Sequence, residues 1–165
     1  MYRYLFHHTF LHAFLRTFLV FLLITTLFSS FLFCDSPDIL TSLDGKGYTY
    51  DEIVNSPKVV LMLWASWCYA CKLKLKEFNQ TPLNHSDADI FFINLGEKAS
   101  TVEAFFDRYN LSSFIEKNIL LDQYSIIEDK IWIIGIPTFV FFKDGKMIYR
   151  SYELNEELIE EVFSD

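Results

Sequence analysis

The sequence predicts an α/β fold in which a central mixed sheet is flanked by helices. Two short and nearly continuous apolar runs support this, Lys58 to Trp64 (KVVLMLW) and Ile90 to Leu95 (IFFINL). Both are too short for core helices and are typical of strands buried on both faces. Segments with a helical spacing of apolar residues alternate with such runs. The 165 residues suffice for one domain with a hydrophobic core.

Charge is distributed unevenly along the chain. Residues 1–34 contain Arg3 and Arg16 and no acidic residue, whereas residues 35–165 contain 12 basic and 22 acidic residues. An acidic body argues against nucleic acid as a partner, because phosphates attract basic surfaces. The lack of acidic residues also marks residues 1–34 as a segment distinct from the rest of the chain.

Residues 1–34 are predicted to be an N-terminal signal anchor. Thr17 to Cys34 is a run of 18 residues without a charge, which as a helix spans roughly 27 Å, enough for the hydrocarbon core of a bilayer. Because basic flanks stay in the cytoplasm, the acidic domain is expected on the periplasmic or extracytoplasmic side. The chain is thus expected in the cell membrane with a single transmembrane helix.

Two other fates of this segment stay open. A cleaved signal peptide needs small residues at positions −3 and −1, and cleavage after Ser30 would place Phe28 at −3. Alternatively, Cys34 could be the lipidated first residue of a lipoprotein, although Phe33 stands where a small residue is expected. We expect an uncleaved anchor first, then a lipoprotein, then a secreted form.

The domain is predicted to begin after a polar linker. Residues 35–41 form this linker, and the turn chemistry of residues 42–47 opens a domain that covers residues 42–165. Tyr48 to Tyr50 alternates like a short edge strand. Asp51 to Ser56 is predicted to be a single helical turn that ends before Pro57, because the residue before proline disfavours helix.

The helices that follow are predicted from apolar spacing and from capping residues. Lys72 to Phe78 is a helix, and Thr81 to Asp89 is a loop. Ser100 is expected to cap the next helix, with Glu103 completing a capping box. The apolar positions of that helix recur at helical spacing: Val102, Phe105, Phe106 and Tyr109.

The C-terminal third is predicted to continue the alternation. Its segments are an extended piece at Ile119 to Leu121, a helix at Ser125 to Trp132, strands at Thr138 to Phe142 and Met147 to Tyr152, and a last helix from Asn155 through Phe163. The Asp144-Gly145 pair is a strong hairpin signal between the two strands. The whole order is β-α-β-α-β-α-β-β-α.

A chemically reactive site is predicted at Cys68 and Cys71, where a buried strand leads into a helix. Two cysteines three residues apart form a dithiol that can close and open as a disulfide. A purely structural role has little support, because so short a loop gains little entropy from closure. The pair could also be half of a zinc site with His85, but the sequence offers no fourth ligand, and we expect no metal.

The segments Trp64 to Lys72, Gly135 to Thr138 and Lys143 to Lys146, in this element order, resemble the thioredoxin superfamily over residues 42–165. The outward-facing anchor and Leu121-Asp122 before a helix look like the membrane-tethered TlpA-like branch. A thioredoxin fold is therefore expected, and the resemblance implies no cofactor.

The resemblance and the helix start assign roles to five residues. Cys68, at the positive end of a helix, is expected to be the exposed nucleophile with a lowered pKa, and Cys71 to resolve the mixed disulfide. Trp67 is expected to pack beside the motif and shape the docking surface. The resemblance implies a cis peptide bond at Pro137, which leaves the backbone of Ile136 free to pair with a substrate strand.

Some positions depart from the family pattern. Met62 stands where thioredoxin has a buried acid, and Lys74 stands where TlpA-like proteins often carry a glutamate. No evident carboxylate therefore deprotonates Cys71. The Tyr69-Ala70 pair matches neither reductants nor oxidants, but the absence of a histidine between the cysteines favours a reductant.

These features predict a membrane-anchored thiol–disulfide oxidoreductase that acts as a reductant on exported proteins, for example in cytochrome c maturation. Its expected partners are exported proteins with thiols or disulfides and a membrane electron donor or acceptor. The alternative is a non-enzymatic module of the same fold that uses its dithiol to hold a partner or a metal.

Overall fold

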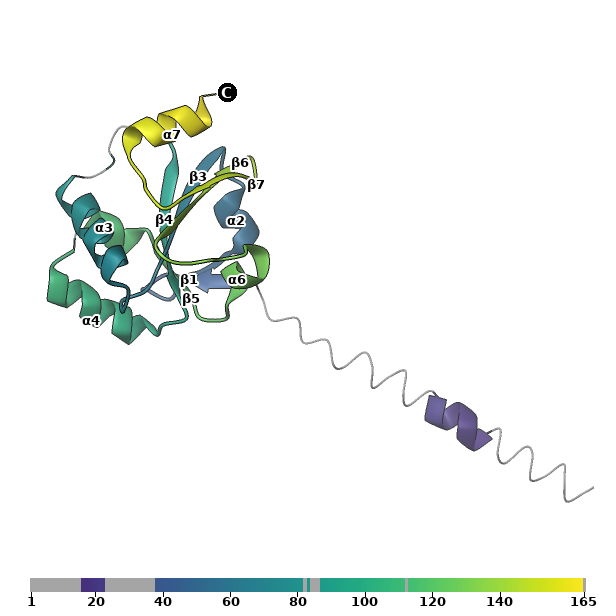
Figure 1. The fold of residues 1–165 in the computed structure, drawn as a ribbon. Coiled ribbons are helices and arrows are strands. Elements are labelled where there is room, and N and C mark those ends of the chain that lie inside the picture. Colours follow the sequence, from purple (N-terminus) through teal and green to yellow (C-terminus); the bar gives the residue numbers. More distant parts are fainter. Residues whose placement is uncertain (1–15, 23–37, 82, 84–86, 112, 165) are drawn as a thin grey trace, which may run out of the picture. The chain divides into compact units, whose positions relative to one another are not determined.

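A seven-stranded mixed sheet forms the centre of residues 38–165 in the computed structural model (Figure 1). The structure describes residues 16–22, 38–81, 83, 87–111 and 113–164. The strands follow one another across the sheet in the order β2-β1-β5-β4-β3-β6-β7. Their bounds are β1 Ile39–Thr41, β2 Gly47–Thr49, β3 Lys58–Trp64, β4 Asp89–Leu95, β5 Ile119–Asp122, β6 Thr138–Lys143 and β7 Lys146–Ser151.

The described helices of this unit connect the strands. Their bounds are α2 Tyr50–Val54, α3 Tyr69–Gln80, α4 Ala99–Tyr109, α5 Ser113–Lys117, α6 Ile126–Lys130 and α7 Glu156–Phe163. Strand β3 pairs in parallel with β4 and antiparallel with β6, and β4 pairs in parallel with β5. Parallel strands end at the same edge of a sheet, so the residues that follow β3, β4 and β5 gather there.

Helices cover both faces of the sheet (Figure 1). Alternate side chains of β3 enter two separate core clusters, Met62 and Trp64 on one face and Leu61 and Leu63 on the other. Helices α3, α4 and α7 contribute to the first cluster, and α2 and α6 to the second. Burial on both faces explains why β3 is a continuous apolar run.

Short elements near the start of the domain differ from the prediction. Residues 39–41, inside the expected linker 35–41, form β1, because Leu40 is fully buried and β1 pairs with both β2 and β5. The folded unit therefore begins before residue 42. Tyr50, expected in a strand, opens α2, whose capping box joins Thr49 and Glu52. Strand β1 was missed because residues 39–41 lie between Pro37 and the turn at 42–47, and three residues are too few to show the alternation of a strand.

The start of one helix was also predicted wrongly, and one short helix was missed. Helix α4 begins at Ala99, and Lys98 occupies its N-cap position without a side-chain cap, so the capping box expected at Ser100 is absent from this helix. The short helix α5 was not predicted. By contrast, the Asp144-Gly145 hairpin is confirmed, with positive φ angles of 49° and 77° at the two turn residues.

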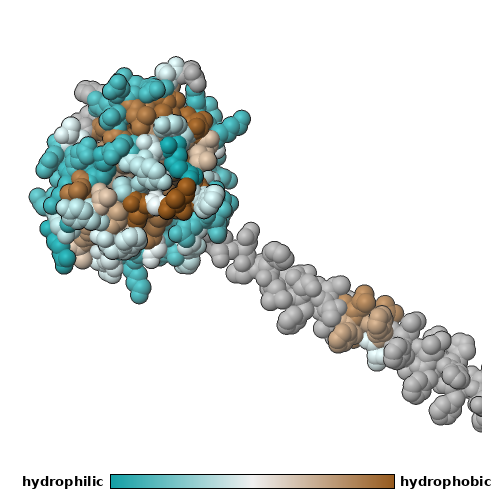
Figure 2. Space-filling view, in the orientation of Figure 1, coloured by the Kyte–Doolittle hydropathy of each residue, from teal (hydrophilic) through white to brown (hydrophobic). Residues whose placement is uncertain are grey.

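In the N-terminal unit, residues 16–22 are helical and exposed, and their surface is mostly hydrophobic (Figure 2). None of the helices within the described residues combines the length and the apolar character needed to cross a bilayer. Most of the anchor expected at 17–34, together with Cys34, lies outside the described residues. The anchor therefore stays a prediction.

Candidate functional site

The two cysteines form a disulfide at the start of α3. Cys68 is the N-cap residue of this helix, and its Sγ accepts a hydrogen bond of 3.0 Å from the backbone N–H of Cys71. The Cα atoms of the pair are 5.2 Å apart. Because the free N–H groups of a helix N-terminus carry partial positive charge, this position favours a thiolate on Cys68 after reduction.

The burial of the pair corrects one expectation. Cys68, expected to be exposed, is 7% exposed, and Cys71 is fully buried. Cys68 is covered because the segment before β6 lies against it, with its Sγ 3.6 Å from the carbonyl oxygen of Ile136. Cys68 is still the more accessible of the two sulfur-bearing residues.

The segment that faces Cys68 contains Ile136 and Pro137, whose peptide bond is cis, the geometry that the resemblance implies. The Thr138 hydroxyl donates a hydrogen bond of 2.5 Å to the Gly135 carbonyl, and Thr138 pairs with Leu63 of β3. These contacts hold the segment at the edge of the sheet where β3 ends. The backbone N–H of Ile136 has no hydrogen-bond partner among the described residues.

A half-buried carboxylate, Glu97, braces the loop that leads to Cys68. It accepts hydrogen bonds from the Ser66 N–H (2.7 Å), the Ser66 hydroxyl (2.5 Å) and the Asn94 side-chain amide (2.7 Å). The carboxylate thus ties the end of β4 to the residue two before Cys68. Sequence reasoning missed Glu97. The available signal was an acid two residues after the end of a strand that runs parallel to β3.

The core cluster that contains Cys71 consists of apolar residues. Met62, at the position where the resemblance places the buried acid of thioredoxin, is fully buried in the same core cluster as Cys71. Trp64 and Asn94 face each other in the β3–β4 register, and the Trp64 Nε1 and Asn94 Oδ1 atoms lack hydrogen-bond partners among the described residues.

Lys74, at the position where the resemblance leads one to expect a glutamate, forms ion pairs with Glu77 (3.0 Å) and Glu153 (2.6 Å). Burial acts to lower the pKa of Lys74, but hydrogen bonds to Glu153 and Glu77 outweigh it, so this pKa is raised above its ordinary value. Lys74 is therefore a cation held by two acids and is unsuited to accept a proton from Cys71.

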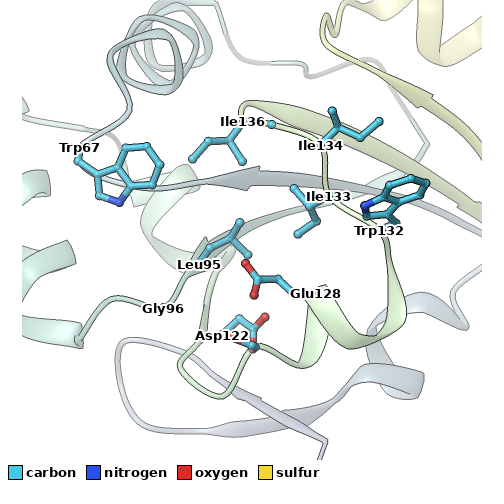
Figure 3. A pocket seen from close by; sticks show the side chains of 11 residues that line it. Trp67, Leu95, Gly96, Asp122, Glu128, Trp132, Ile133, Ile134 and Ile136 are labelled. Atoms are coloured by element: carbon cyan, nitrogen blue, oxygen red, sulfur yellow. The ribbon is translucent and has the colours of Figure 1, made fainter.

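A cavity of about 370 Å³ adjoins the disulfide at Trp67 and Ile136 (Figure 3). Its apolar lining comes mainly from the end of β4 and from the segment between α6 and β6: Trp67, Leu95, Trp132, Ile133, Ile134 and Ile136. Trp67, expected to pack beside the motif, is 74% exposed. Figure 3 shows Trp67 and Trp132 at opposite ends of the cavity, with Asp122 and Glu128 between them.

The two acids of the cavity differ in their surroundings. Asp122 is buried, and its two oxygens accept hydrogen bonds from the backbone N–H groups of Ile126 (2.8 Å) and Ile127 (2.9 Å), so this side chain caps α6. Burial raises the pKa of Asp122, and the charge of Glu128 adds to this, against the lowering effect of the two N–H groups. Glu128 is exposed. Asp122 was noted from the sequence only as part of the Leu121-Asp122 pair, and neither acid was predicted to be a site residue.

A metal centre has no evident ligand set here. Among the described residues, no group of three or more histidine, cysteine, aspartate or glutamate side chains is arranged to hold a metal ion. His85, considered above as a ligand beside the two cysteines, lies outside the described residues.

Comparison with protein-family models and with curated proteins finds no match for this chain. Solved structures, however, resemble it. StoA from Bacillus subtilis is 23% identical with a TM-score of 0.59, over 77% of this chain and 95% of StoA. A secreted Mycobacterium tuberculosis disulfide oxidoreductase homologous to Escherichia coli DsbE is 18% identical, with a TM-score of 0.58 and coverage of 78% and 95%.

The pneumococcal exposed lipoprotein thioredoxin from Streptococcus pneumoniae is 22% identical with a TM-score of 0.57, over 76% of this chain and 96% of that protein. At such identities the likeness bears on the fold alone. The mixed sheet with helices on both faces, and the cysteine pair at the start of α3, agree with it. The chain therefore has a thioredoxin-like α/β fold.

Proposed function

We propose that this chain is a membrane-anchored thiol–disulfide oxidoreductase that reduces disulfides of exported proteins. The observation that carries the proposal is the position of Cys68, at the N-cap of α3 with its sulfur against the Ile136 carbonyl. A sulfur at this place combines a stabilised thiolate with a neighbouring peptide backbone that can hold a substrate.

The reduced protein would act in two exchange steps. The Cys68 thiolate attacks one sulfur of a substrate disulfide, forms a mixed disulfide and expels the second substrate sulfur as a thiolate. Cys71 then loses its proton to solvent and attacks the Cys68 sulfur, which closes the protein disulfide and releases the first substrate sulfur. Two electrons pass from the protein to the substrate, and a membrane dithiol donor returns them.

The unpaired backbone N–H of Ile136 supports a mode of substrate binding by the backbone. An extended segment of the substrate can add to the backbone there as a short strand, which brings its disulfide to Cys68. The uncharged run at 17–34 supports the anchor and the extracytoplasmic location. The maturation of c-type cytochromes is the process to which the resemblance points.

The test compares Cys68→Ser, Cys71→Ser and the unchanged chain on a model peptide disulfide. We expect Cys68→Ser to lower turnover to the rate without protein, and Cys71→Ser to accumulate a mixed disulfide visible by mass spectrometry. A binding module, by contrast, would keep partner binding in Cys68→Ser and trap no mixed disulfide. Equilibration with glutathione tests the direction, since a potential near the thioredoxin value of about −270 mV indicates a reductant.

A further inference from the structure

The cavity beside the disulfide presents large apolar side chains to solvent. Trp67 is 74% exposed, Trp132 82% and Ile134 73%, although all three line one cavity. Exposed apolar groups gathered around a hollow mark a binding surface. Because the cavity adjoins Ile136, whose carbonyl lies 3.6 Å from the Cys68 sulfur, a molecule in it would lie next to the reacting atoms.

The charge in this cavity is negative and in part unpaired. The Glu128 carboxylate has no ion-pair or hydrogen-bond partner among the described residues, and no lysine or arginine is among the described residues of the lining. Lys130, the cation of the same helix, pairs instead with Asp38 at 2.6 Å. Asp122 is too buried for direct contact and adds charge below the surface.

The charge of the whole domain points to the same kind of partner. Residues 35–165 carry 22 acidic and 12 basic side chains. Such an excess speeds encounter with a basic polypeptide and opposes encounter with a second copy of the chain. A two-fold pairing through the cavity would also bring two Glu128 carboxylates together. The complementary occupant is therefore a basic segment of another protein.

We propose that this cavity is a subsite for a lysine or arginine of the disulfide substrate, close in sequence to its reactive cysteine. The proposal rests on the proposed function. The aliphatic stem of the basic residue would pack on Ile134 and Trp132, where a guanidinium can also stack, and its charged head would meet Glu128. The substrates are thus exported polypeptides with a basic residue within two or three positions of a disulfide-bonded cysteine.

The test uses the full chain, reduced beforehand, and three peptides of the form X-Ala-Cys-Ala-X, each as a mixed disulfide with 2-mercaptoethanol. X is arginine, glutamine or glutamate. The oxidation rate of the protein is measured in single turnover by stopped-flow tryptophan fluorescence. Each rate is divided by the rate of the same peptide with dithiothreitol, which removes the intrinsic reactivity of the peptide. We expect the arginine peptide to react about tenfold faster than the glutamate peptide, from one attraction gained and one repulsion avoided.

Variants locate the preference. Glu128→Gln should lower the tenfold ratio to about threefold, the part that the charge of Asp122 below the surface maintains. Asp129→Asn, which removes the same charge from an exposed neighbour outside the cavity, should keep the tenfold ratio. Equal ratios in Glu128→Gln and Asp129→Asn would overturn the subsite. So would a dimer by light scattering that Trp132→Glu dissociates.

Failure of the subsite and failure of the proposed function give different results. If the three peptides react equally fast with the unchanged chain but not with Cys68→Ser, the subsite is refuted and the oxidoreductase stands. If no peptide oxidises the reduced protein faster than it oxidises Cys68→Ser, both proposals are refuted.

Discussion

Two glutamates lie near the disulfide, and they are used differently. Glu97, which follows β4, is half-buried and accepts three hydrogen bonds from Ser66 and Asn94. Glu128, in α6, is exposed and has no such partner among the described residues. A carboxylate whose acceptor sites are filled by its own chain holds structure, and one that is left open at a cavity is available to a ligand. The first braces the loop before Cys68, and the second faces the proposed substrate.

The largest expected difference between the two is in stability. Glu97→Ala leaves the buried Asn94 amide and the Ser66 N–H without an acceptor, so we expect a loss of about 2–3 kcal/mol in the free energy of unfolding. Glu128→Ala should change it by less than ~0.5 kcal/mol, as is usual for an exposed residue without partners. Urea unfolding of both full-length variants provides the measurement.

Glu97→Gln tests the same hydrogen bonds, because glutamine keeps one acceptor oxygen. This variant should lose less of the free energy of unfolding than Glu97→Ala. Equal stability of Glu97→Ala and Glu128→Ala would show that the bonds to Ser66 and Asn94 contribute nothing, and the distinction between the two carboxylates would then fail.

A smaller effect is expected at the aromatic end of the cavity. Trp132→Ala should lower kcat/KM for the arginine peptide about fivefold, corresponding to ~1 kcal/mol of lost contact, with unchanged unfolding free energy because the side chain is 82% exposed. Tyr124→Ala is the matched control, since Tyr124 is 69% exposed and does not line the cavity. A similar loss in both variants would contradict a specific role for Trp132.

Much of this site could be predicted from the sequence. The strand before Cys68, the helix after Cys71 and the hairpin at Asp144-Gly145 each carry a local signal: a continuous apolar run, a helix start and a turn dipeptide. The thioredoxin-like fold followed from their order. These features depend on residues close together in the chain, so that a single sequence contains the information.

The two glutamates and the depth of Cys68 could not be predicted in this way. Glu97 meets Ser66 across 31 positions, and Cys68 is covered by Ile136 across 68 positions. The cavity brings together the end of β4, the end of β5, α6 and the segment before β6. Such contacts are fixed by strand order and register, which a local pattern does not specify.

The smallest predicted effect concerns the acidic pair of the cavity and its dependence on pH. Burial, with the charge of Glu128 adding to it, raises the pKa of Asp122 above the ordinary value of 3.8. An acid whose pKa is raised on folding takes up its proton before other aspartates as the pH falls. Its protonated form stabilises the fold at low pH, and this contribution is lost as the pH rises through the raised pKa.

The preference for a basic peptide should follow the charge of Asp122. The rate ratio between the arginine and glutamine peptides should be constant at neutral pH and should fall about twofold as the pH drops through the raised pKa of Asp122. Taking the ratio cancels the protonation of the Cys68 thiolate at low pH, because this slows the reactions of both peptides equally. In Glu128→Gln the Coulombic contribution to the pKa of Asp122 is absent, so the remaining fall should move to lower pH. A ratio that stays constant from pH 7 to pH 4 in Glu128→Gln would exclude Asp122 from recognition and leave Glu128 as the only cavity charge that acts on the basic residue. A midpoint that is the same in both proteins would show that the charge of Glu128 does not act on Asp122.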